Sequence, residues 1–141
     1  QGLLHVRAMF QAVDDLFRDV EQHVTTKTGR SNLAYWRQRI VFSIEALNEK
    51  TLLHEGSQQI AAARRARSRK TQDAHRTAAK QSFAKAIAAG EAALDAMASE
   101  VRDDSDRASL ATYYHLFVRE VREQIDIVLA GKGAAARRGP M

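Results

Sequence analysis

The sequence predicts an all-α protein, an antiparallel four-helix bundle, and three observations lead to this prediction. Apolar residues recur at alternating steps of three and four in four separate stretches, the spacing of helices that each bury one face. The chain has one proline, Pro140 near its end, so proline interrupts none of these stretches. Tight turn segments separate the first stretch from the second and the third from the fourth, as an antiparallel bundle requires.

The first helix is predicted over about residues 3–26. Its apolar residues form a heptad seam, which we expect to be buried: Leu3, Val6, Phe10, Val13, Phe17, Val20 and Val24. Gly29 is suited to the left-handed cap that ends this helical region, and Ser31 or Asn32 to the start of the next.

The second helix is predicted over about 32–55, extending to about residue 68. Its large apolar residues lie on one stripe: Leu33, Trp36, Ile40, Ile44 and Leu47. We expect Trp36 to pack in the core, because it lies on this stripe. Glu45 and Glu49 lie off the stripe and are predicted to be solvated.

The third and fourth helices are predicted over 71–102 and 105–130. The third combines dense alanine with the seam Phe83, Ile87, Gly90, Leu94, Met97 and Val101, so a neighbouring backbone can approach closely at Gly90. The fourth is predicted to bury Leu110, Tyr114, Phe117, Val121, Ile125 and Val128. The four helices make one domain over 3–130, followed by a disordered basic tail at 131–141.

Composition excludes several classes of protein and site. The chain has no cysteine, which removes disulfides and thiolate metal sites, and no apolar run of about 18 residues that could span a membrane. No Glu-x-x-His metal motif occurs, so no metal or cofactor is predicted. No secretory signal is visible and a cytoplasmic location is expected, although Gln1-Gly2 is compatible with a tag remnant that leaves the native start open.

The predicted site is a basic segment in which large apolar residues nearly vanish. Between Ser57 and Lys80 the net charge is +6, in a chain whose total is +5. We expect helical extensions with a turn near 68–71, with a disordered connection as the alternative. The candidate binding residues are Arg64, Arg65, Arg67, Arg69, Lys70, Arg76 and Lys80.

Two kinds of partner suit this segment. An acidic protein surface is the first, and the backbone of a nucleic acid is the alternative, since arginines displace condensed counterions from phosphates. No aromatic residue lies between Arg64 and Lys80, so base stacking is not expected there.

Arg69 and His75, with five residues between them, resemble the Arg-x(4–6)-His element of HEPN-domain ribonucleases, which are helical bundles. The resemblance covers seven residues, and Lys70 stands where that family usually has Asn, Asp or His. It implies that Arg69 would stabilise phosphate charge and His75 would move a proton. These two are the only catalytic candidates.

The sequence thus favours a non-enzymatic interaction or adaptor module that contacts an acidic partner through its basic segment. Sequence-independent nucleic-acid binding and HEPN-like ribonuclease activity are the alternatives. The regular seam of the first helix also suits packing between chains, so a homodimer that completes the bundle stays open.

Overall fold

The computed structural model describes residues 2–131, and helices make up these residues apart from short turns. The elements are α1 (Gly2–Glu21), α2 (Lys27–Arg65), α3 (Arg69–Ala98), α4 (Asp104–Tyr114), the π-helical turn η1 (His115–Arg119) and α5 (Glu120–Leu129). The last three follow one another without a break. The all-α prediction is confirmed for the described residues, whereas the predicted tail from 132 to 141 lies outside them.

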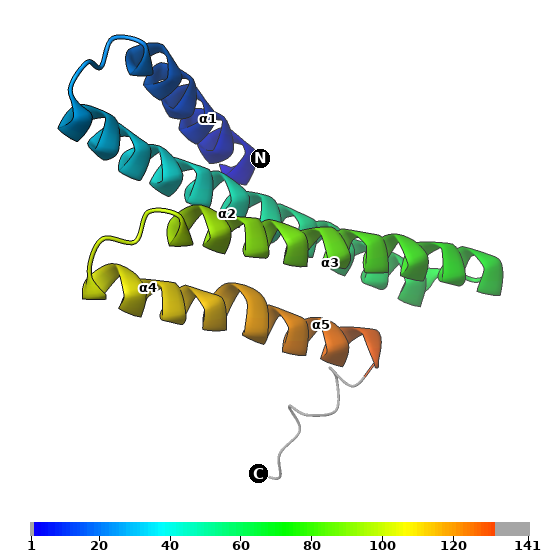
Figure 1. The fold of residues 1–141 in the computed structure, drawn as a ribbon. Helices are drawn as coiled ribbons and strands as arrows, with labels where there is room; N and C mark the ends of the chain where they lie inside the picture. The colour runs from blue at the N-terminus through cyan, green and yellow to red at the C-terminus, as the bar shows by residue number, and fades with distance from the viewer. Residues whose placement is uncertain (1, 132–141) are drawn as a thin grey trace.

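The longest helices, α2 and α3, lie side by side and form a hairpin (Figure 1). The rod made by α4, η1 and α5 runs along α3, and α1 lies against the first part of α2 (Figure 1). The closed end of the hairpin projects beyond the end of α5 (Figure 1). Among the described helices, α1 makes extensive contacts with α2 alone. The side of α1 that faces away from α2 is therefore left open.

The packing of α2 against α3 uses small residues. The buried positions of α2 include Ala46, Glu49, Gly56 and Ala63, at steps of three and seven, and those of α3 include Ala79, Ala86, Gly90 and Ala93. A Cβ atom built on Gly56 would collide with the ring of Phe83 on α3, and one on Gly90 would lie 2.8 Å from Oε1 of Glu49 on α2. Side chains larger than hydrogen would push these helices apart.

Several helix boundaries differ from the prediction because other residues cap the helices. Thr26 begins α2, and its hydroxyl accepts a hydrogen bond from the Gly29 amide at 3.1 Å. Ser31 and Asn32 therefore lie inside α2, as does Gly56. Asp103 caps α4 by accepting from the Asp106 amide at 2.8 Å.

The burial of several large residues was predicted wrongly. Trp36 is 59% exposed and Tyr114 is 57% exposed. On the stripe predicted for the second helix, Ile44 is buried and Leu33, Ile40 and Leu47 are half-buried, so Trp36 is the one member whose predicted burial is wrong. On the last rod, Tyr113 rather than Tyr114 packs against Phe42, with ring centroids 5.0 Å apart.

Polar contacts hold α1 to α2. Asp14 is 1% exposed and receives Arg18 at 2.7 Å and Arg37 at 3.3 Å, and the Nε atom of Arg7 donates to Oδ1 of Asn48 at 2.7 Å. The predicted burial of the whole first seam is wrong, because Val13 and its apolar neighbours on the outer side of α1 stay exposed.

A second polar cluster joins α4 to α2. Asp106 accepts from the Arg102 amide at 2.9 Å and from the Tyr35 hydroxyl at 3.2 Å, and it pairs with Arg39. The Arg102 amide lowers the pKa of Asp106, partial burial opposes this, and the charge of Arg39 lowers the pKa further. The Asp106 carboxylate thus stays ionised and holds the two helices together.

Candidate functional site: a basic hairpin tip

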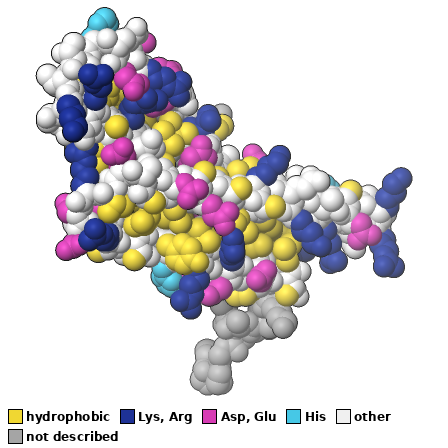
Figure 2. Space-filling view, viewed as in Figure 1, with side chains coloured by type: hydrophobic (Ala, Val, Ile, Leu, Met, Phe, Trp, Pro, Cys, Tyr) yellow, Lys and Arg dark blue, Asp and Glu magenta, His cyan; other side chains and the backbone are white. Residues whose placement is uncertain are grey.

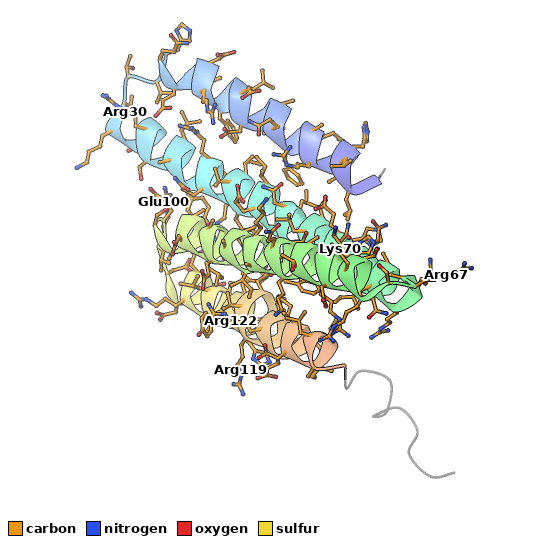
Figure 3. The ribbon with its side chains drawn as sticks, turned by 90° about the vertical axis from the view of Figure 1, so that its right-hand side faces the viewer. Arg30, Arg67, Lys70, Glu100, Arg119 and Arg122 are labelled. Carbon is orange, nitrogen blue, oxygen red and sulfur yellow. The ribbon has the colours of Figure 1, made fainter. Side chains whose placement is uncertain are left out.

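The predicted binding residues gather at the closed end of the α2–α3 hairpin, which we call the basic tip. It comprises Arg64, Arg65, Arg67, Arg69, Lys70, Arg76 and Lys80, and all seven side chains are exposed. Lys and Arg side chains crowd this end of the molecule in Figure 2, and Arg67 projects from its extremity in Figure 3. The segment that carries them is helical up to Arg65 and again from Arg69.

Local hydrogen bonds build the turn of the basic tip. The hydroxyl of Ser68 accepts from the Thr71 amide at 3.1 Å, which caps α3, and the Gln72 side chain donates to the Ala66 carbonyl at 3.1 Å. Across the hairpin, Nδ1 of His75 lies 2.7 Å from Oε1 of Gln59. The cations therefore stand on a defined turn, Ala66 to Ser68, which overlaps the predicted turn at 68–71 only at Ser68.

Arginines of the basic tip differ from the other arginines in how they are bonded. Within residues 2–131, none of the five tip arginines makes a side-chain hydrogen bond or ion pair. Every other arginine of that range makes at least one: Arg7, Arg18, Arg30, Arg37, Arg39, Arg102, Arg107, Arg119 and Arg122. The other arginines are thus bonded to groups of the same chain, whereas the guanidinium groups of the basic tip are available to bind a partner.

The cations at the start of α3 repel the positive end of that helix when no partner is bound. The N-terminus of a helix carries a partial positive charge, yet α3 begins with Arg69 and Lys70 and has no acidic residue in its first turn. An anion bound at the tip would relieve this repulsion.

Replacing Lys70 with glutamate should therefore stabilise the free protein. A carboxylate in the first turn of α3 interacts favourably with the helix terminus, and the gain should be about 1 kcal/mol in the free energy of unfolding. Urea denaturation measures it. Lys85→Glu, at an exposed position in the middle of α3, is the matched control and should change the free energy by less than about 0.5 kcal/mol. Equal effects of both substitutions would mean that net charge, not the helix terminus, is responsible.

A groove of about 490 Å³ lies at the base of the tip, where α5 ends against the hairpin. It has a mixed lining, with cations from Arg64, Arg76 and Lys80, a single carboxylate from Asp73, and apolar side chains that include Ile60 and Val128. This combination suits a ligand that carries both carboxylates and apolar groups.

Arg69 and His75 are not brought together by the helix that carries both. Positions six apart on an α-helix point about 120° apart around the axis. Arg69 is exposed at the first residue of α3, whereas His75 is half-buried against Gln59. Within one chain the two side chains therefore do not face a shared reaction centre.

Glu49 is the residue whose environment differs most from its predicted solvation. It is 1% exposed, and its Oε1 atom has no hydrogen-bond partner among the described residues. A Cβ atom on Gly90 would lie 2.8 Å from that oxygen, so the carboxyl group rests against the glycine. Burial raises the pKa of Glu49 to about 7, and nearby Lys50 opposes the rise. The signal was present in the sequence, because Glu49 continues the row of Ala46, Leu53 and Gly56.

The π turn produces another pair that a regular helical spacing does not predict. Nε2 of His115 lies 3.0 Å from Oε1 of Glu120, five residues later. Both side chains are half-exposed, so this pair lies at the surface of the last rod.

Two other features are absent from the part of the chain that the structure describes. No group of three or more His, Asp or Glu residues between 2 and 131 is placed to hold a metal ion. None of the described helices combines the length and apolarity needed to cross a membrane. Comparisons with models of protein families, with curated proteins and with solved structures found no match to this chain.

Proposed function

We propose that this protein is a non-enzymatic interaction module whose basic tip binds an acidic segment of another protein. The observation that carries the proposal is the contrast between unbonded tip arginines and internally bonded arginines elsewhere in residues 2–131. Interfacial charges of this kind steer a partner of opposite charge and fix its orientation.

The groove at the base of the tip favours a peptide over a nucleic acid. Arg64, Arg76 and Lys80 would face carboxylates, while Ile60 and Val128 would contact apolar side chains between them. A nucleic-acid backbone offers the charges without the apolar side chains, and no aromatic residue of the tip could stack a base. The proposed ligand is therefore a peptide in which acidic and apolar residues alternate.

Fluorescence anisotropy with three labelled probes of similar charge tests this function: an Asp/Glu-rich peptide with interspersed leucines, single-stranded RNA and duplex DNA. The peptide should bind most tightly. In the variant Arg64→Glu/Arg76→Glu/Lys80→Glu its affinity should fall roughly 100-fold, because three attractive contacts become repulsive.

The matched control is Lys27→Glu/Lys50→Glu/Lys85→Glu, which changes the net charge equally at exposed sites away from the tip. It should weaken binding less than about fivefold. Equal losses in the two variants would contradict a localised site. Tighter binding of RNA or DNA, with a logarithmic salt slope near −5, would replace the proposal with nucleic-acid-backbone binding.

RNA integrity in the same mixtures tests the ribonuclease alternative. The interaction module should leave RNA intact. Cleavage that disappears in His75→Ala would instead assign catalysis to Arg69 and His75.

A further inference from the structure

One side of α1 carries a row of large apolar side chains that the fold leaves exposed, which we call the α1 stripe. The exposed fractions are 40% for Val6, 58% for Met9, 36% for Val13, 62% for Leu16 and 48% for Val20. The steps between them are three, four, three and four, so they form the a and d positions of a heptad seam. A contiguous apolar face of this kind marks an interaction surface.

The two flanks of the α1 stripe differ in character. On the flank toward α2 lie Phe10 and Phe17, which are half-buried and occupy e positions. On the open flank lie His5, Ala12 and Asp19, which are exposed and occupy g positions. The partner must therefore match a histidine at one end, a small residue in the middle and a carboxylate at the other end.

We infer that the α1 stripe is covered by α1 of a second copy of this chain, lying antiparallel. In the register that pairs a positions with d positions, Val6 packs on the partner's Leu16 and Met9 on the partner's Val13. The two-fold axis passes between the Met9–Val13 layer and its symmetry copy, so each contact occurs twice.

Charges on the open flank support the antiparallel orientation. In an antiparallel pair g positions face each other, so His5 meets the partner's Asp19 at both ends and Ala12 meets its own counterpart in the middle. In a parallel pair g positions face e positions, and Asp19 would meet the apolar Val24. A second copy in the antiparallel orientation thus gives each of the three residues on the open flank a compatible neighbour.

Such a dimer would present its basic tips at opposite ends. The contacts of Arg37 with Asp14 and of Arg7 with Asn48 fix α2 antiparallel to α1, so that α2 extends about 20 residues past the middle of α1. At ~1.5 Å per residue, the tips would lie roughly 60 Å apart. A bivalent arrangement would raise the avidity for a partner with repeated acidic segments.

Sedimentation equilibrium of the wild type and two leucine variants tests the dimer. Leu16→Glu should weaken dimerisation at least 100-fold, because each copy buries one charged group in the seam. Leu4→Glu is the matched control, since Leu4 is 59% exposed on the same helix but outside the α1 stripe, and it should leave the dimer intact. Wild-type protein that stays monomeric at several hundred micromolar would overturn the inference, as would equal effects of the two variants.

A charge exchange tests the orientation independently of the core contacts. His5→Asp should weaken the dimer about fivefold by placing like charges together twice, and adding Asp19→Lys should restore it. Failure of the double variant to recover would exclude the antiparallel register. Two measurements on the monomer would show that each variant folds: an unchanged far-ultraviolet circular dichroism spectrum and an unchanged tryptophan emission spectrum. The emission comes from Trp36, the only tryptophan, which is exposed on α2.

Discussion

Replacing Glu49 with glutamine should remove most of the pH dependence that this buried carboxyl group gives to stability. Burial raises the pKa of Glu49 from 4.5 to about 7 in the folded protein. Between these two values the folded state keeps a proton that the unfolded state has released, so the free energy of unfolding falls as pH rises. The loss should reach about 3 kcal/mol above pH 7, since each pKa unit is worth about 1.4 kcal/mol.

Urea denaturation from about pH 4 to pH 9 measures this effect. Glu49→Gln should match the wild type at the acidic end, where both side chains are neutral, and exceed its stability by about 3 kcal/mol at the basic end. Glu55→Gln is the matched control, because Glu55 is exposed on the same helix and should leave the wild-type profile unchanged. Parallel profiles for the wild type and Glu49→Gln would show that the carboxyl group titrates in water rather than in the core.

The all-α fold class could be predicted from the sequence, but the face of α2 that packs against α3 could not. The large apolar residues of the second helix suggested a core stripe through Trp36, whereas α2 packs on α3 through Ala46, Gly56 and Ala63. Large side chains dominate a hydrophobicity pattern, although small ones permit the closest approach of two helices. The row of small residues has the same heptad spacing, and pattern alone does not rank two seams on one helix.

The basic tip was predictable because charge density and absence of large apolar residues are compositional features. The availability of its arginines was not, since it depends on which carboxylates the fold brings near each guanidinium. Arg37 reaches Asp14 and Arg39 reaches Asp106, 67 residues away, whereas Arg67 reaches no carboxylate among the described residues. Long-range pairings of this kind follow from the packing of helices and not from local sequence.

Replacing Gly90 with alanine should destabilise the fold, although alanine is the better helix former. The new Cβ atom would lie 2.8 Å from Oε1 of Glu49 and 2.8 Å from the carbonyl oxygen of Phe117. Overpacking of this kind costs about 3 kcal/mol, against a gain of about 1 kcal/mol in helix propensity, so a net loss of about 2 kcal/mol is expected. Thermal and urea denaturation measure it.

Two further variants separate the sources of this loss. Gly2→Ala is the matched control, because no atom lies within 4 Å of its new Cβ, and it should be neutral or slightly stabilising. Glu49→Ala/Gly90→Ala removes the clash with the carboxylate but keeps the clash with Phe117, whose carbonyl belongs to the backbone of η1 and cannot rotate away. The double variant should therefore recover only part of the loss caused by Gly90→Ala, measured against Glu49→Ala. Full recovery would mean that η1 lies farther from α3, and a stabilised Gly90→Ala would mean that α2, α3 and η1 do not meet at this glycine.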